Sequence, residues 1–227
     1  DVLQSTQYST PIASTVRELV TNACDSQREK EIALEILSGK KKIEDYYITR
    51  DDEEYVDSNF TPEYYDPEYL SADNNRVVVR YKENDGTGYC DVFSVVDYGV
   101  GIGGSRLEGY LELGFSTKRN TAENFGAFGL GAKVPLSTGV DFYTVETAHN
   151  GKLFKMNCFA YKTDFLIGKF QADGHITFSD GTQVNYIKTN APNFTKISFG
   201  VKRHNRTKFV DAVQDQLNYI DNVDMKY

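Results

Sequence analysis

Glu18, Asn22 and Asp25 place carboxylate and amide groups at the spacing of one helix face. At roughly 100° per residue, positions i, i+4 and i+7 fall within about 60° of one another. Such oxygens are the ligands that Mg²⁺ prefers, and the metal keeps several water molecules. A carboxylate one turn from the metal can polarise a water molecule for in-line attack on a phosphate. The segment predicts a metal- and water-binding helix face, with an inert solvated face as the alternative.

A second polar group, Asp97, closes an apolar segment that is typical of a strand, and Gly99 and Gly101 follow it. A carboxylate at a strand end can accept a hydrogen bond from the exocyclic amine of adenine, and glycines let the backbone approach the base. With Gly104 these residues also form GxGxxG, the dinucleotide-binding pattern. We favour the adenine interpretation, because the downstream strands are predicted to be antiparallel rather than to alternate with helices.

A third segment, 114–133, is rich in glycine and leads into a helix predicted over 131–137. Successive backbone amides at a helix N-terminus form a cradle for anions. The segment is not a Walker A loop, because Gly131 is followed by Ala-Lys-Val. A flexible loop with exposed charges is the alternative. The candidate phosphate-binding residues are Ser116, Thr117, Lys118, Gly126, Phe128, Gly129, Leu130, Gly131 and Lys133.

The elements that must position these residues follow from periodicity and turn signals. We expect helices over 13–38, 105–113, 131–137 and 207–223, and strands over 76–82, 89–97, 141–148, 151–161, 165–171, 183–188 and 196–201. On the first helix Val16, Leu19, Val20 and Ala23 oppose the polar face and should pack on the sheet. Helices followed by mostly antiparallel strands and a last helix predict an α/β (α+β) two-layer sandwich.

Residues 40–75 differ in composition from the rest of the chain. Between positions 44 and 75 there are eleven acidic residues, one basic residue and six tyrosines. This composition disfavours a buried element and predicts a surface insertion, with one or two short helices. An acidic and aromatic surface of this kind is a candidate docking site for a protein partner, and a solvated loop is the alternative.

Composition excludes several classes of protein. The 227 residues suit a single domain, and the net charge of −8 argues against general nucleic-acid binding, although a local basic patch is compatible with it. Three cysteines without metal-ligand spacing argue against a disulfide framework and favour a cytoplasmic setting. We expect no signal peptide, and no apolar run of these residues reaches membrane-spanning length. The chain begins at Asp1 rather than Met, so we expect a domain of a longer protein.

In order and chemistry, the segments 18–25, 97–101 and 126–133 resemble the N, G1 and G2 boxes of the GHKL ATPases. This group includes gyrase B subunits, MutL, the large heat-shock chaperone, MORC proteins and sensor histidine kinases. The resemblance covers nearly the whole chain. It implies a Bergerat ATP-binding fold, with ATP or ADP and Mg²⁺ held between a helical layer and the sheet, and a lid over 104–133.

The resemblance also implies roles for individual residues. Glu18 corresponds to the general base, Asn22 to the Mg²⁺ ligand and Asp97 to the adenine-binding acid. The glycines of 126–131 and Lys133 correspond to the lid hinge and phosphate loop. The last box of the family usually contains Gly-Thr before a β-branched strand. Thr195, preceded by Phe194, and Thr182, preceded by Gly181, are both candidates, and we favour Thr195.

Within the group, the stretches 114–119 and 128–135 are similar to bacteriophage rIIA-type proteins, and MORC proteins share part of the pattern. The resemblance implies an ATPase that acts as a nucleotide-driven conformational switch, slow in isolation, within the cytoplasm of an infected bacterium. In relatives ATP drives dimerisation, so a homodimer through the full-length protein is expected. The alternatives are a non-catalytic nucleotide-sensing module and a MORC-, MutL- or topoisomerase-like ATPase that acts on DNA, although direct DNA binding by this domain is not expected.

Overall fold

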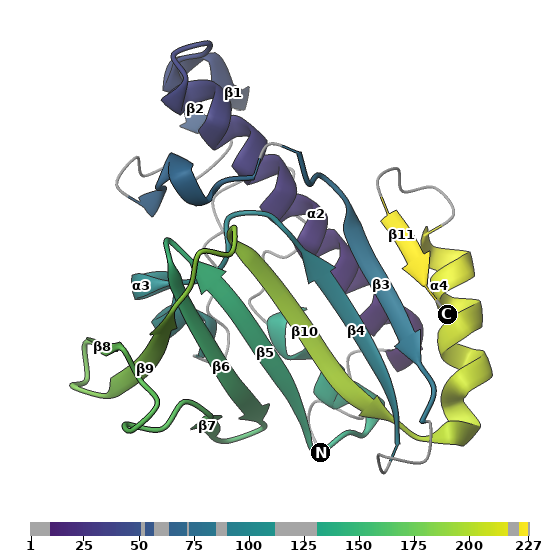
Figure 1. Cartoon of the computed structure of the whole chain (residues 1–227). Coiled ribbons are helices and arrows are strands. Elements are labelled where there is room, and N and C mark those ends of the chain that lie inside the picture. Colours follow the sequence, from purple (N-terminus) through teal and green to yellow (C-terminus); the bar gives the residue numbers. More distant parts are fainter. Residues whose placement is uncertain are drawn as a thin grey trace.

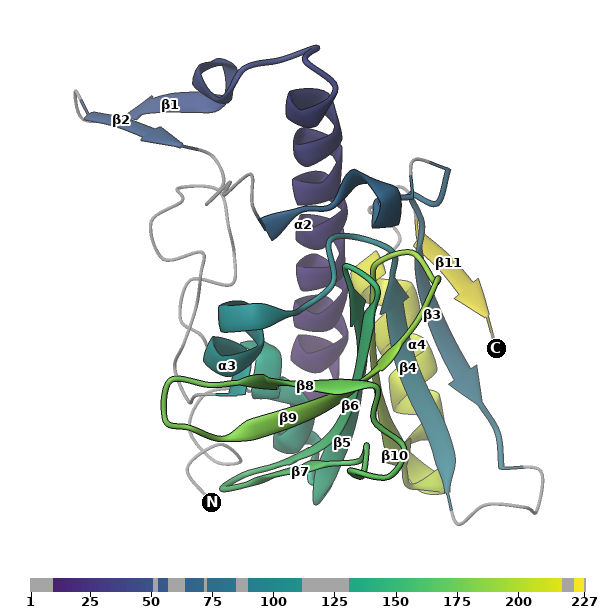
Figure 2. The same ribbon diagram turned by 60° about the vertical axis from the view of Figure 1, so that its left-hand side comes forward.

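The computed structural model describes residues 10–50, 53–56, 64–71, 73–84, 90–111, 131–217 and 223–226. Within these residues, helices α2 and α4 cover one face of a nine-stranded sheet, as Figures 1 and 2 show from two directions. This arrangement confirms the predicted mixed α/β class with a mostly antiparallel sheet. None of the described helices is both long and apolar enough to cross a membrane.

Helix α2, Pro11–Leu37, forms the long element of the helical layer. Pro11 occupies the first turn, where a missing amide hydrogen breaks no helical hydrogen bond. No glycine or proline interrupts the remaining residues, and Gly39 follows the helix with a φ of 72°. Its apolar face is buried as predicted, because Val16, Leu19, Val20 and Ala23 are each at most 4% exposed.

The strands cross the sheet in the order β11-β3-β4-β10-β5-β6-β9-β8, and β7 pairs with β6. Their bounds are β3 Val77–Lys82, β4 Asp91–Asp97, β5 Phe142–His149, β6 Lys152–Phe159, β7 Thr163–Phe165, β8 Gly174–Thr177, β9 Gln183–Lys188, β10 Phe194–Val201 and β11 Val223–Lys226. Within the described residues the pairs are antiparallel except that of β11 with β3, which is parallel. Strands β4 and β10, far apart in sequence, are therefore neighbours.

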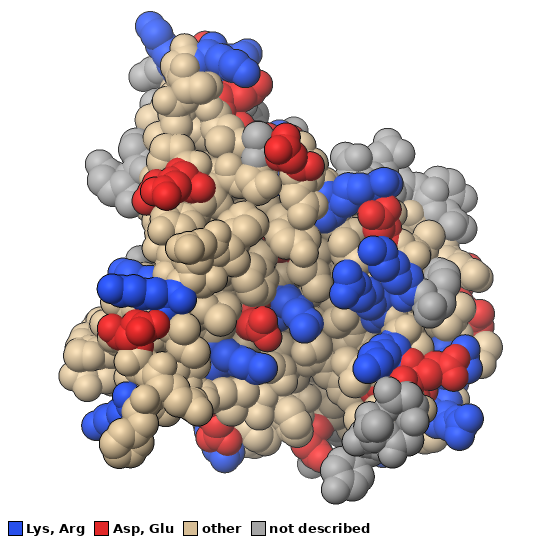
Figure 3. Space-filling view, in the orientation of Figure 1, with Lys and Arg blue, Asp and Glu red and all other residues tan. Residues whose placement is uncertain are grey.

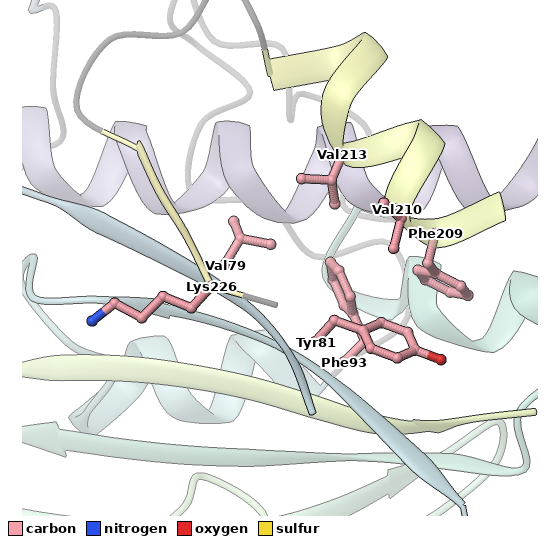
Figure 4. Close-up of a pocket in the computed structure, with 7 residues that line it drawn as sticks. All are labelled: Val79, Tyr81, Phe93, Phe209, Val210, Val213 and Lys226. Carbon is pink, nitrogen blue, oxygen red and sulfur yellow. The ribbon is translucent and has the colours of Figure 1, made fainter. Parts of the chain in front are cut away.

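Side chains alternate between the two faces of each strand, and one set forms the core with the helices. Helix α4, Arg206–Leu217, lies over β3 and β4, and Figure 4 shows Phe209, Val210 and Val213 above Val79, Tyr81 and Phe93. The ring centroid of Phe209 is 5.1 Å from that of Phe93 and 5.9 Å from that of Phe199. These aromatic contacts join α4 to the sheet.

Replacing Phe209 with Ala is expected to lower the free energy of unfolding by about 3–5 kcal/mol, because the side chain is 2% exposed and its loss leaves a cavity. Urea unfolding monitored by circular dichroism measures the change. Phe170→Ala is the control, since the Phe170 side chain is fully exposed and its removal should change stability by less than about 0.5 kcal/mol. Equal effects of the two substitutions would contradict this packing.

The face of the sheet turned away from α2 and α4 carries charged and polar side chains among a few apolar ones. Alternation puts Arg80, Ser94, Lys196, Glu146 and Lys155 on this face. Lys155 pairs with Glu146 at 3.6 Å. Figure 3 shows this side of the molecule, with basic and acidic side chains interspersed over it. Apolar side chains therefore gather on the other face, which the helices cover.

Three predicted elements differ from the structure. Helix α4 is described as Arg206–Leu217, and the helix predicted over 207–223 is wrong at its last residue, because 223–226 form strand β11. The strand predicted over 165–171 is wrong, because β7 ends at Phe165 and a turn follows, in which the Gln171 amide donates to the Gly168 carbonyl at 3.0 Å. Residues 131–138 form the 3₁₀ helix η4, which contains Pro135 and so lacks one amide donor. Helix α3, Gly104–Leu111, begins as predicted.

The acidic insertion contains short helices, as predicted, and also a hairpin that was not predicted. It includes the 3₁₀ helices η1, Ile43–Tyr46, and η3, Pro67–Tyr69, and a hairpin of β1, Tyr47–Arg50, with β2, Glu53–Val56. In its last part Tyr65 and Leu70 are each 5% exposed and pack in a cluster with Ala33 and Val100. The prediction that this composition disfavours burial is thus wrong for Tyr65 and Leu70, because their side chains reach α2 and the loop after β4.

Candidate functional site

Glu18, Asn22 and Asp25 lie on one face of α2, and each is half-buried. They are therefore neither part of the apolar core nor fully solvated. The same face contacts other segments at two positions. Near its start the Thr15 hydroxyl donates to the Val134 carbonyl of η4 at 3.2 Å.

Further along the same face, the Ser26 hydroxyl accepts a hydrogen bond from the Val100 amide at 3.2 Å. Thr15 and Ser26 are eleven residues apart, which corresponds to about 16 Å along a helix. The three predicted polar residues lie between these two anchor points. The polar face of α2 thus contacts η4, at the end of the predicted lid, near Thr15, and the loop after β4 near Ser26.

Asp97 is the last residue of β4 and is 5% exposed. Because it shares a strand face with Phe93 and Val95, it points toward the helical layer. Its Oδ1 accepts a hydrogen bond from the Gly99 amide at 2.9 Å. In the register of β4 and β10, Thr195 lies directly opposite Asp97. Asp97, predicted to contact adenine, and Thr195, favoured for the last box, are therefore neighbours on the helix-facing side of the sheet.

The register also distinguishes the two candidates for the last box. Thr195 is 7% exposed and lies between Asp97 of β4 and Thr147 of β5. Thr182 precedes β9, and its hydroxyl donates to Asp180 Oδ2 at 3.0 Å. Strands β10, β5 and β6 separate β9 from β4. Geometry therefore favours Thr195, as the sequence analysis did.

The loop over 98–103 is held by side chains from four different segments. Four backbone amides of the loop donate hydrogen bonds to side-chain oxygens. The Gly99 amide donates to Asp97 at 2.9 Å and the Val100 amide to Ser26 at 3.2 Å. The Ile102 amide donates to Thr147 at 2.8 Å and the Gly103 amide to Tyr64 at 3.2 Å. The ring of His149 also bonds the loop, because its Nδ1 lies 2.9 Å from the Val100 carbonyl oxygen. The path of this loop is thus fixed by α2, by the sheet and by the insertion.

Close contacts explain why glycine occupies two positions of this loop. A Cβ atom on Gly99 would lie 2.1 Å from Ser26 Oγ and 2.5 Å from the Ser26 carbonyl carbon. Gly101 has a φ of 68°, and its Cβ would lie 2.1 Å from the Ala148 carbonyl oxygen. Both glycines therefore allow the loop to lie against α2 and β5. The antiparallel neighbours of β4 also contradict a dinucleotide-binding βαβ unit, so the GxGxxG pattern here does not mark one.

Two side chains of α2, Lys30 and Cys24, feel the charge of Asp97. Lys30 of α2 is fully buried, and its Nζ donates to the Asn74 carbonyl at 2.8 Å. Burial lowers the pKa of Lys30, while the negative charges of Glu31 and Asp97 oppose that shift. Burial, followed by the charges of Asp25 and Asp97, raises the pKa of the Cys24 thiol to about 11. The thiol is therefore protonated at neutral pH and is not a nucleophile.

The predicted phosphate loop is described at its C-terminal end. Gly131 begins η4, and Lys133 is 8% exposed with its Nζ donating to the Leu111 carbonyl at 2.7 Å. Lys133 thereby links the last residue of α3 to η4, two described parts of the predicted lid. The role of Lys133 as a phosphate ligand stays a prediction. The other candidates of this loop lie outside the described residues, namely Ser116, Thr117, Lys118, Gly126, Phe128, Gly129 and Leu130.

No group of three or more acidic, histidine or cysteine side chains in the described part of the chain could hold a metal by itself. This does not exclude a nucleotide-bound Mg²⁺, which typically uses one or two protein ligands, several waters and the phosphates. The half-buried amide of Asn22 suits such a single protein ligand.

Sequence reasoning missed three of the side chains that hold the loop. Ser26 follows Asn22 by one turn, so helical periodicity could have indicated it. Thr147 and Tyr64 come from segments distant in sequence, and no local pattern marks them. A scan of the chain against protein-family models found no match, and a search of curated proteins found no similar protein.

Proposed function

We propose that this chain is an ATP-binding domain of the GHKL type, related to phage rIIA proteins, which uses nucleotide as a conformational switch. The observation that carries the proposal is the position of α2. One helix presents Glu18, Asn22 and Asp25 between the loop that follows Asp97 and the η4 end of the predicted lid. The described parts of the three segments, 18–25, 97–101 and 131–133, thus lie along one helix, and this supports the proposal.

The order of residues along α2 indicates how the nucleotide would be oriented in the site. Adenine would lie at the Asp97 and Thr195 end, where a buried carboxylate can accept from its exocyclic amine. The phosphates would extend along α2 toward η4. Asn22 would hold Mg²⁺ through its amide oxygen. Glu18, one turn further from the adenine end, would accept the proton of the attacking water.

Isothermal titration calorimetry with ATP, with and without Mg²⁺, tests the proposal on the wild type and on Asn22→Ala. We expect micromolar to submillimolar affinity in the wild type, strengthened by Mg²⁺. The variant should keep the Mg²⁺-independent affinity and lose the enhancement, because it lacks the amide ligand. No ATP binding by a wild-type domain with a cooperative unfolding transition would overturn the proposal.

Glu18→Gln should reduce ATP hydrolysis at least about 100-fold while ATP affinity stays within about twofold, because the amide cannot accept a proton from water. Single-turnover assays with protein in excess over radiolabelled ATP suit the slow rate that we expect. Glu31→Gln is the matched control, since Glu31 lies on α2 but is exposed. Equal turnover by the wild type and Glu18→Gln would instead support a non-catalytic nucleotide-sensing module.

A further inference from the structure

The last part of the acidic insertion contacts the candidate nucleotide loop directly. The Tyr64 hydroxyl accepts a hydrogen bond from the Gly103 amide at 3.2 Å and donates one to the Gly101 carbonyl at 3.3 Å. One hydroxyl therefore bridges two positions of the loop. The Tyr64 ring also stacks on His149, with centroids 4.2 Å apart and an interplanar angle of 31°.

The Tyr64 backbone is held as well, because its carbonyl accepts from Asn150 Nδ2 at 3.0 Å. Burial raises the pKa of Tyr64 to about 12, so its hydroxyl stays protonated and can donate at neutral pH. Burial lowers the pKa of His149, whose neutral ring can donate from Nδ1 to the Val100 carbonyl. Hydrogen bonds and ring stacking around Tyr64 thus join the insertion, the loop 98–103 and the end of β5.

Helix α3, the first element of the predicted lid, is tied to the same contacts through Arg106. The Arg106 guanidinium lies 3.9 Å from the Tyr64 ring centroid, in cation–π contact. Its Nη1 lies 2.5 Å from Glu29 Oε1, with both side chains 17% exposed. The Tyr65 hydroxyl donates to Glu29 and accepts from Arg106 Nη2. Glu29 continues the α2 face that carries Asn22 and Asp25, so this network closes one end of the candidate site.

We propose that Tyr64, Arg106 and Glu29 are positioning residues, which hold the loop 98–103 and helix α3 in the geometry that binds nucleotide. The insertion is thereby coupled to the nucleotide. A ligand that moves 64–71 changes ATP affinity, and ATP in turn stabilises 64–71, because coupling between two sites is reciprocal. This inference rests on the proposed function.

Tyr64→Phe is the sharpest test, because phenylalanine keeps the ring against His149 and Arg106 and removes the bridging hydroxyl. Tyr69→Phe is the matched control. Tyr69 lies in the same segment, and its hydroxyl lies beside Gly151 rather than at the loop 98–103. Both variants are compared with the wild type at a temperature where thermal unfolding shows all three to be folded.

Two measurements are made on each protein. Calorimetry gives the dissociation constant of ATP. We expect it to rise about 3- to 10-fold in Tyr64→Phe, because this is the change in affinity that the loss of one neutral hydrogen bond causes. In Tyr69→Phe it should stay unchanged. Amide hydrogen exchange without nucleotide follows the loop, and we expect Gly103 to exchange about 3- to 10-fold faster in Tyr64→Phe. Added ATP should slow exchange over 64–71 in the wild type.

The outcomes separate this inference from the proposed function. If the wild type binds ATP, and Tyr64→Phe binds it equally well, the positioning role is wrong while the proposed function stands. If the wild type does not bind ATP, the proposed function fails, and the positioning of nucleotide fails with it, whatever the exchange rates show. Weaker ATP binding with faster Gly103 exchange, and neither change in Tyr69→Phe, supports the inference.

Discussion

Replacing Asp97 with Asn should weaken ATP binding about 10- to 100-fold and leave the fold intact. A hydrogen bond to a charged group contributes about 1.5–3 kcal/mol, and about 1.4 kcal/mol corresponds to a tenfold change in affinity. In the wild type, Asp97 Oδ1 accepts a hydrogen bond from the Gly99 amide at 2.9 Å. Asparagine keeps one side-chain oxygen that can accept the same hydrogen bond. Its other group is an NH₂ donor, which would meet the adenine amine as donor against donor. The substitution therefore removes recognition of the base while keeping the loop in place.

Calorimetric titration of ATP into the wild type and the variant measures the loss, with thermal unfolding recorded in parallel. Asp91→Asn is a close control, because Asp91 is the first residue of the same strand and is also 5% exposed. Its carboxylate bonds the Tyr81 hydroxyl at 2.7 Å and the Asn84 amide at 2.8 Å. That substitution should affect stability but not ATP affinity. Equal affinity in the wild type and Asp97→Asn would place adenine elsewhere.

The elements that frame the site could be predicted because their signals are local. The apolar residues of α2 recur at helical spacing, and the polar residues occupy the opposite face of the same helix. The apolar run before Asp97 predicts a strand that ends at that carboxylate, and β4 does end there. Antiparallel order followed from short alternating segments with turn residues between them. For these elements, the residues that determine the secondary structure are close together in the sequence.

The rest depends on contacts between distant segments. No local pattern states that β10 pairs with β4, so the sequence could favour Thr195 over Thr182 only by its place in the chain, and the register shows that Thr195 lies opposite Asp97. Composition predicts that an acidic, tyrosine-rich segment is solvated, yet Tyr64 and Tyr65 reach the loop and Glu29 through tertiary contacts. Likewise, the short strand β11 follows a helical pattern and is stabilised by pairing with β3.

Gly101→Ala should lower the free energy of unfolding by about 2–5 kcal/mol and weaken ATP binding with it. A positive φ costs a residue with a Cβ about 1–2 kcal/mol, and overpacking adds about 1–3 kcal/mol. Both apply here, since φ is 68° and the added Cβ would lie 2.1 Å from the Ala148 carbonyl oxygen. Relief of that contact requires the loop to move away from β5, which would displace the backbone next to Asp97.

Gly104→Ala separates the two causes, because Gly104 has a φ of 55° but nothing within 4 Å of its added Cβ. The Gly104→Ala variant should lose about 1–2 kcal/mol of unfolding free energy, the cost of the positive φ alone, and keep its ATP affinity. Urea unfolding and calorimetry on both variants give the comparison. Equal losses of stability would mean that the loop does not lie against β5. A larger loss in Gly101→Ala, with weaker ATP binding, would show that close seating of this loop on the sheet is what presents Asp97 to the nucleotide.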